Sequence, residues 1–208
     1  MRIYTPDECT SMYDTATEGY GSVHNITVFK FSDYWLPSRI DVLNRAYSHN
    51  INNVVESLDL ITWPNMEEVL EYLEVYLLRD PSHDHFNGSA GAHLRDDKIK
   101  GHITLYGRST PVPRFMSHYI FCHEMGHVIQ DTYCRNLDQI KMYAELRNAD
   151  YKRNEEWTKD WKQLWAEDWR WLFCTDTAHQ DTWSMEYEKP DNRTKEFMLD
   201  SYRQTKRL

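Results

Sequence analysis

The sequence predicts an α+β fold in which a mixed lobe of strands and helices precedes a mainly helical lobe. Segments rich in β-branched and aromatic residues, at about 25–31 and 99–106, have strand character. After residue 110, apolar residues recur mostly at helical spacing. The chain has 208 residues, which suits one domain with its own core. We therefore expect a single domain, 1–208, made of a mixed lobe at 1–110 and a helical lobe at 111–208.

The first half of the chain is predicted to alternate between strands and short helices. Residues 25–31 alternate in polarity and form a strand, and a short helix follows at about 40–46. Residues 51–63 are apolar and β-branched, which favours a strand or a strand with a turn. Residues 65–77 carry apolar side chains at helical spacing, so we expect a helix that ends before Asp80-Pro81.

A loop and a hairpin lead into the helical lobe. Residues 81–91 are crowded with Ser, His, Asp, Asn and Gly, which indicates a loop. Residues 92–95 and 99–106 then form the predicted hairpin. Three long helices with apolar faces follow, at about 114–134, 136–149 and 155–173. A short helix is expected near the C-terminus.

The net charge and the apolar pattern argue against nucleic acids and membranes as the main partners. A net charge of −9 disfavours a nucleic-acid backbone or an anionic membrane as the main partner and favours a neutral or basic polypeptide. No apolar run reaches the roughly 18 residues that a membrane span needs, and the N-terminus lacks the apolar core of a secretory signal. We therefore expect a cytoplasmic protein with a polypeptide partner. The oligomeric state is left open by the sequence.

The cysteines predict reduced thiols. Cys9, Cys122, Cys134 and Cys174 form no CxxC pair, so a cysteine zinc site is not expected. Cys122 and Cys134 lie twelve residues apart in one predicted helix. They would lie roughly 18 Å apart along its axis, too far for a disulfide.

The segment 123–127, His-Glu-Met-Gly-His, carries the clearest chemical signal. Side chains four residues apart lie on one face of a helix, so His123 and His127 can bind one zinc ion. Glu124 can accept a proton from a water molecule that zinc activates, which makes it the candidate general base. Gly126 costs about 1 kcal/mol against alanine inside a helix, so we expect another segment to pass close to it. The alternative is a pair of buried histidines that are only hydrogen-bonded.

A catalytic zinc site needs a third protein ligand, and the candidates lie in the predicted helix that ends at residue 173. On a helical wheel, Gln163 and Glu167 lie beside the apolar face and Asp168 lies within it. A carboxylate beside an apolar stripe needs a partner, which zinc or a zinc-bound histidine supplies. Glu167 is the preferred third ligand and Asp168 the alternative. Without zinc, Glu167 is solvated and Asp168 pairs with an arginine such as Arg170 or Arg114.

Residues 120–128 and the later segment 165–170, Trp-Ala-Glu-Asp-Trp-Arg, together resemble the gluzincin-type HExxH zinc peptidases. The resemblance is to anthrax lethal factor-like catalytic domains and their phage and prophage relatives, over roughly residues 92–200. It implies a zincin fold: a small twisted mixed sheet whose edge strand, here about 101–106, lines a cleft above the HExxH helix. It also implies that Zn²⁺ is held by two histidines, a later glutamate and water. A peptide substrate would add to the edge strand.

One position departs from the pattern of this family. The family carries two acidic residues four apart on the later helix, of which the first binds zinc and the second supports a ligand histidine. Here Gln163 stands at the first position and Glu167 at the second. Either Glu167 has moved into the zinc shell, or the site is weakened or silent. The family also supplies a tyrosine to the oxyanion, and neither Tyr143 nor Tyr151 matches it by spacing.

The leading hypothesis is a zinc-dependent endopeptidase, a hydrolase in which His123, His127 and Glu167 hold Zn²⁺ and Glu124 is the general base. The alternative is a catalytically silent, phage-encoded interaction protein with a zincin fold, for which Gln163 is the motivation. A narrower option is a regulatory peptidase that cuts one repressor-like target.

Other histidines and the tryptophans are assigned structural roles. His83, His85 and His93 lie near a polar loop and are not expected to form a second metal site. His118 lies off the ligand face of its helix. The tryptophans between Trp157 and Trp171 recur at helical spacing, which indicates core packing.

Overall fold

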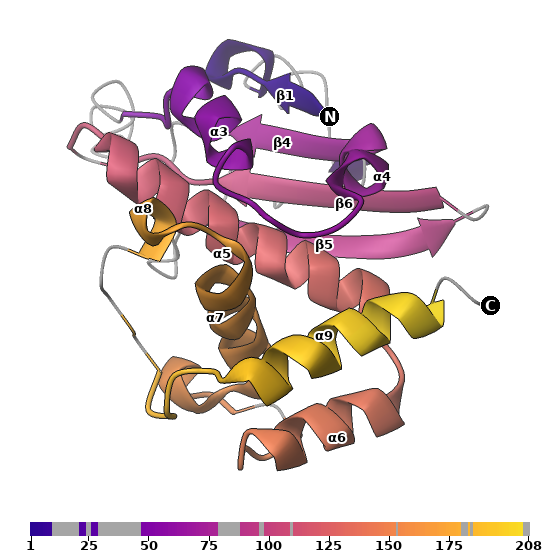
Figure 1. Ribbon diagram of the computed structural model, residues 1–208. Helices are drawn as coiled ribbons and strands as arrows, with labels where there is room; N and C mark the ends of the chain where they lie inside the picture. Colours follow the sequence, from indigo (N-terminus) through magenta and orange to yellow (C-terminus); the bar gives the residue numbers. More distant parts are fainter. Residues whose placement is uncertain are drawn as a thin grey trace.

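A four-stranded mixed sheet forms one layer of the protein, in the strand order β1-β4-β6-β5 (Figure 1). The computed structural model describes residues 1–9, 21–23, 26–28, 47–78, 88–95, 98–108, 110–152, 154–179, 183 and 185–205. The four strands are β1 (Arg2–Tyr4), β4 (Leu73–Leu77), β6 (Lys98–Leu105) and β5 (Gly88–Arg95). β4 pairs in parallel with β1 and β6, whereas β5 pairs antiparallel to β6. The predicted mixture of helices with a small mixed sheet is confirmed.

The predicted hairpin is confirmed and is longer than expected. β5 and β6 pair from Arg95 opposite Lys98 to Gly88 opposite Leu105, so β5 includes part of the predicted loop. β6 has a strand on each side. The expectation that residues 101–106 form the edge of the sheet is therefore wrong, and β5 is the edge strand beside the helices.

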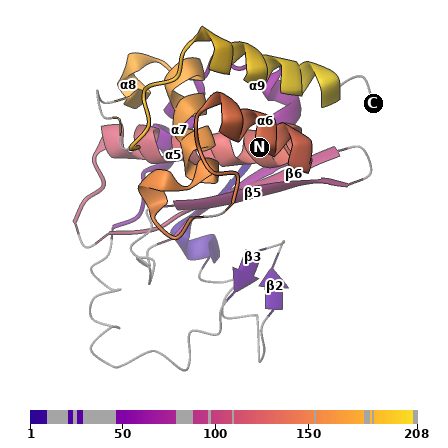
Figure 2. The same cartoon turned by 90° about the horizontal axis from the view of Figure 1, so that it is seen from below.

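The helical lobe is built around one long buried helix. α5 (Arg114–Tyr133) matches the predicted helix at 114–134 and crosses one face of the sheet (Figures 1 and 2). Further helices pack on the side of α5 that faces away from the sheet: α7 (Trp161–Phe173), α8 (Asp176–His179) and α9 (Asn192–Thr205). α6 (Leu137–Leu146) packs on α9. Because it is covered from both sides, α5 is buried along most of its length.

Two predictions in the first half of the chain are wrong. The expected strand at 51–63 begins instead with a helix, α3 (Ile51–Leu58), because the Asn50 side chain accepts a hydrogen bond from the amide of Asn52 and caps it. The expected helix at 65–77 is a short helix, α4 (Met66–Glu71), followed by strand β4. Leu73 and Leu77 lie four residues apart and continue the helical spacing of Met66, Val69 and Leu70, but positions four apart also share one face of a strand.

Two smaller elements complete the described part of the chain. β2 (Gly21–Val23) and β3 (Ile26–Val28) form an antiparallel pair, and β3 lies within the predicted strand at 25–31. The helix expected at 40–46 and the loop histidines His83 and His85 lie outside the described residues, as does the His93 side chain.

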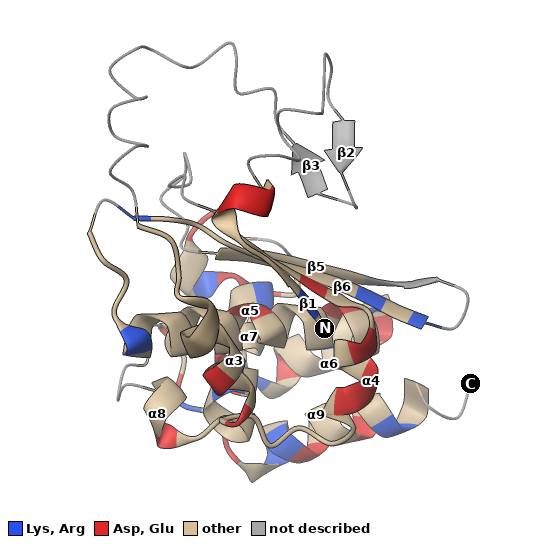
Figure 3. Cartoon of the chain, turned by 90° about the horizontal axis from the view of Figure 1, so that it is seen from above, with Lys and Arg blue, Asp and Glu red and all other residues tan. Residues whose placement is uncertain are grey.

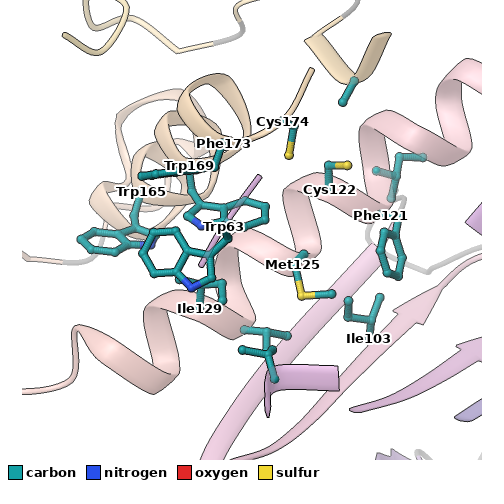
Figure 4. Close-up of a cluster of buried hydrophobic side chains, with 14 of the residues drawn as sticks. Trp63, Ile103, Phe121, Cys122, Met125, Ile129, Trp165, Trp169, Phe173 and Cys174 are labelled. Atoms are coloured by element: carbon teal, nitrogen blue, oxygen red, sulfur yellow. The ribbon is translucent and has the colours of Figure 1, made fainter. Parts of the chain in front are cut away.

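The core lies between the sheet and the helical lobe. Trp165, Trp169 and Phe173 of α7 pack with Trp63 in the same cluster as the apolar side chains of α5 (Figure 4). The four cysteines are free and buried, in agreement with the prediction of reduced thiols.

Charged side chains of both signs are interspersed over the surface, and the first turn of α4 carries Glu67 and Glu68 (Figure 3). Within the described residues, no helix combines the length and the apolar character that crossing a bilayer requires.

Candidate metal centre

His123 and His127 project from α5 toward α7 as a pair. Their ring centroids lie 4.9 Å apart and their ring planes are nearly perpendicular, at 86°. The two residues are 6% and 5% exposed, so solvent reaches only the edge of the pair. The helical spacing predicted from the sequence therefore places both imidazoles on one buried face.

A glycine brings the later helix onto this face. A Cβ atom at Gly126 would lie 2.8 Å from both the Cα and the carbonyl oxygen of Ala166 on α7. Real Cβ atoms do not approach a backbone so closely, so only glycine permits this crossing of α5 and α7. The expectation that another segment passes close to Gly126 is confirmed.

Gln163 occupies the position between the two histidines. Its side-chain Oε1 lies 3.1 Å from Nε2 of His123 and 3.1 Å from Nε2 of His127. The position is fixed by the start of α7, where the Asp160 carboxylate accepts hydrogen bonds from the amides of Lys162 and Gln163. Asp160 also explains why α7 begins at Trp161 rather than at the predicted residue 155.

Glu167, the predicted third ligand, lies on the opposite side of His123. Its Oε1 is 2.7 Å from Nδ1 of His123 and accepts a hydrogen bond from the Tyr119 hydroxyl at 3.1 Å. Its Oε2 is 2.5 Å from the guanidinium of Arg170. The structure therefore brings Glu167 to His123 but not to the point where the two Nε2 atoms converge.

The charges around Glu167 keep it ionised. Burial alone raises the pKa of Glu167, but the hydrogen bond and charge of His123, together with the charge of Arg170, lower that pKa to about 2. Burial opposes a charge on His123 as well, and Glu167 outweighs it and raises the pKa of His123. An ionised carboxylate on Nδ1 orients the imidazole and makes the opposite nitrogen a better electron donor.

The donor set fits a metal ion. When the His123 ring is neutral and donates its Nδ1 proton to Glu167, its Nε2 has a lone pair that faces the Gln163 oxygen, which is also an acceptor. Two acceptors at this distance repel each other unless a proton or a cation lies between them. Ligand atoms around a tetrahedral zinc ion lie about 3.4 Å apart, from bonds of about 2.1 Å, which is close to the 3.1 Å separations. His127 directs its Nε2 to the same point.

Glu124 is buried beside the histidine pair, against the first residue of β5. A Cβ atom at Gly88 would lie 2.7 Å from Oε1 of Glu124, so β5 packs directly on this carboxyl group. Burial raises the pKa of Glu124 to about 7, although the charge of His123 lowers it in part. A carboxyl group with a pKa near neutrality can both accept and release a proton, as the predicted general base must.

Asp168, the alternative third ligand, points away from the histidines. The Tyr143 hydroxyl donates a hydrogen bond to it at 2.7 Å, and Arg147 forms an ion pair with it. Burial raises the pKa of Asp168 to about 7. Asp168 therefore has an arginine partner, as the sequence predicted. The partner is Arg147, the residue directly after α6, rather than Arg170 or Arg114. Tyr143 is occupied by this contact.

Trp157 packs against the core, as its spacing predicted, and it also lies beside the histidine pair. Its ring lies 5.8 Å from the ring of His123, at 32°. It belongs to the 3-10 turn η2 (Trp157–Lys159), not to α7, so the helical wheel did not apply to it. The capping residue Asp160, three positions later, is the signal that marks this boundary.

Among the described residues, no group of three or more His, Cys, Asp or Glu side chains is arranged to hold a metal ion. The third group at this site is an amide. Comparisons with protein-family models, curated proteins and solved structures find no match for this chain.

Proposed function

We propose that this protein is a zinc-dependent peptidase with a zincin-type fold. The observation that carries the proposal is that Nε2 of His123 and Nε2 of His127 both lie 3.1 Å from Oε1 of Gln163. The buried carboxyl group of Glu124 lies on the same helix, and Glu124 directly follows His123 in the sequence. His123, His127 and Gln163 would hold the ion, and Glu167 would orient His123 from the other side.

The chain's own residues divide the work of hydrolysis. When bound, zinc supplies Lewis-acid activation of the carbonyl and of water. Glu124 accepts a proton from water as the water oxygen bonds to the carbonyl carbon. The C–N bond then breaks, and Glu124 passes the proton to the leaving nitrogen. Gly88 leaves room for the Glu124 carboxyl group, because any side chain at position 88 would displace that group.

The edge strand supports a polypeptide as substrate. β5 has β6 on one side and runs along α5 from Glu124 toward the end of the helix. An extended peptide can hydrogen-bond to such an edge through its own backbone, independent of its sequence. Trp157, against His123, offers an apolar surface to one substrate side chain.

The test separates metal binding from catalysis. Elemental analysis of the purified protein is expected to find about one zinc ion per chain, and His127→Ala is expected to lose it. Glu124→Gln is expected to retain zinc and to lose cleavage of a peptide mixture by a factor of at least about 100. A folded wild-type protein that binds no zinc contradicts the proposal.

Gln163 also favours a second candidate from another class. A neutral amide at the metal weakens binding, so the same fold would serve as an interaction protein without catalysis. This candidate is correct if the zinc-loaded wild type cleaves no peptide while Gln163→Glu does. It is wrong if the wild type and Gln163→Glu both cleave.

A further inference from the structure

The Asp131 side chain, just beyond the histidines, connects three elements through one ion pair and one hydrogen bond. Asp131 lies on α5, one helical turn after His127 and on the same face. Its Oδ1 is 2.8 Å from the amine of Lys162 on α7, and its Oδ2 accepts a hydrogen bond of 3.4 Å from the amide of Ala92 on β5. The edge strand, the histidine helix and α7 are therefore connected at this point.

The hydrogen bond to Asp131 occupies the amide of Ala92 on the free edge of β5. In an antiparallel pair, amides point alternately toward the partner strand and away from it. The Ala92 amide points away from β6, so the outward amides nearer Glu124 are those of Ala90 and Gly88. A peptide that adds to this edge can pair with Ala90 and Gly88 but meets Asp131 at Ala92.

The distance from His127 to Asp131 along α5 matches the length of a short extended peptide. His127 and Asp131 are four residues apart on α5, or about 6 Å along its axis. An extended chain advances about 3.4 Å per residue, so about two or three residues fit before the chain reaches Asp131. A peptide that adds to this edge would therefore end at Asp131, close to the histidines.

The direction in which a peptide pairs with β5 decides whether its N-terminus or its C-terminus lies at Asp131. Antiparallel strand pairs are more common and more stable than parallel ones. A peptide antiparallel to β5 has its N-terminal end at Ala92 and Asp131. The Asp131 carboxylate is 21% exposed and has lone pairs beyond the two in use, so it is accessible to an amine.

We infer that Asp131 binds the free α-amino group of a peptide substrate, so that the enzyme removes two or three residues from the N-terminus. This inference rests on the proposed peptidase function and names its substrate class. Lys162 holds Asp131 in position between α5 and α7. The substrate is then cut near its amino end, not within the chain as the sequence alone predicted.

Binding is measured first, without cleavage. Zinc-loaded Glu124→Gln protein is titrated by calorimetry with a short neutral peptide that has either a free or an acetylated N-terminus. Acetylation is expected to raise Kd about tenfold or more, since it removes the charge that Asp131 meets. Adding Asp131→Asn is expected to abolish this difference. The matched control is Asp200→Asn, which removes the carboxylate of the exposed Asp200–Arg203 ion pair on α9 and should preserve the difference.

Several results overturn the inference. Equal affinity for both peptides does so, as does absence of peptide binding. A loss of affinity only on amidation of the C-terminus also does so, because the peptide would then run in the opposite direction toward Lys162.

Cleavage by the wild type distinguishes this inference from the proposed function. Mass spectrometry is expected to find N-terminal fragments of two or three residues, released from the free but not from the acetylated peptide. Equal internal cleavage of both peptides overturns the inference and leaves the peptidase function intact. Tight, Asp131-dependent binding without any cleavage by the wild type has the opposite meaning: amino-terminus recognition stands and the peptidase function falls.

Discussion

The two nitrogens of His123 meet very different surroundings. On the Nδ1 side, Glu167 accepts a hydrogen bond and is itself held by Arg170 and Tyr119, all within the buried helical lobe. On the Nε2 side stands the neutral amide of Gln163, at 3.1 Å. The chain thus has a charged carboxylate behind the histidine and a neutral amide in front of it. We therefore expect changes on the Nδ1 side to affect fold stability most, and changes on the Nε2 side to affect the proposed binding of a metal ion.

The largest expected effect comes from removing the support. Glu167→Ala leaves the fully buried guanidinium of Arg170 without its carboxylate partner. Breaking one partner of a buried ion pair typically costs about 3–5 kcal/mol, so we expect a loss of this size in the free energy of unfolding, measured by urea denaturation of the zinc-free protein. Glu145→Ala, an exposed change on α6, serves as the control and should stay within about 0.5 kcal/mol. A loss below about 1 kcal/mol for Glu167→Ala would show that the support is not structural.

The helix crossing that creates both sides is the next target. Gly126→Ala places a methyl group against backbone atoms of Ala166 at 2.8 Å. Overpacking of this kind costs about 1–3 kcal/mol, and we expect a decrease of about 2 kcal/mol in unfolding free energy together with weaker zinc binding. The added change Ala166→Gly should give little recovery, because the clash is with Cα and the carbonyl oxygen rather than with the Ala166 side chain. Full recovery in the double variant would contradict this geometry.

The metal-facing side is tested by supplying the missing charge. Gln163→Glu keeps the length and branching of the side chain and places a carboxylate at the point where the two Nε2 atoms converge. We expect zinc affinity to rise by about 10- to 100-fold, or about 1.4–2.7 kcal/mol, measured by competition with a chelator of known affinity. Gln163→Met, similar in length but a poor zinc ligand, should lower the affinity. Unchanged affinity in both variants would place Gln163 outside the metal shell.

Much of this arrangement follows from the sequence, and the exceptions have physical reasons. The HExxH spacing correctly put His123 and His127 on one face, and Gly126 correctly indicated a close crossing. A helical wheel, however, gives the face of a residue and not the atom that it contacts. It could not tell whether Glu167 approaches Nδ1 or Nε2 of His123, which depends on how far α7 is shifted along α5. The contact point between the two helices is at Gly126 and Ala166, and nothing in the pattern of α7 marks Ala166 as the residue that meets Gly126.

The fold was predicted best where the pattern is local. The 114–134 helix and the hairpin follow from periodicity and turn residues close in sequence. β4 was not recognised as a strand, because Leu73 and Leu77 are four residues apart, a spacing that places them on one face of either a helix or a strand. The edge position of β5 depends on the strand order, which no local pattern records. The site residues on β5, Gly88 and Ala92, were missed for that reason.

His49 sharpens the contrast between a buried histidine beside a carboxylate, such as His123, and one whose side-chain partner is a hydroxyl group. His49 is 3% exposed and its Nδ1 lies 3.0 Å from the Ser117 hydroxyl. Burial lowers the pKa of His49 to about 4, with a smaller opposing effect from a backbone hydrogen bond to Tyr106. Its reference value is 6.5, so between these values the unfolded chain binds a proton that the folded chain does not. Stability is therefore lost as the pH falls from 6.5 toward 4.

Unfolding free energy measured at pH 6.5 and pH 4.5 is expected to differ by about 2 kcal/mol from this residue alone. His49→Gln removes the titrating group and should reduce the pH dependence by that amount, while at pH 7.5 it costs only what the altered packing costs. The same pH dependence in both proteins would show that His49 is protonated in the folded state. Burial alone would then not keep a histidine neutral in this fold, and the raised pKa of His123 would no longer require Glu167 as its cause.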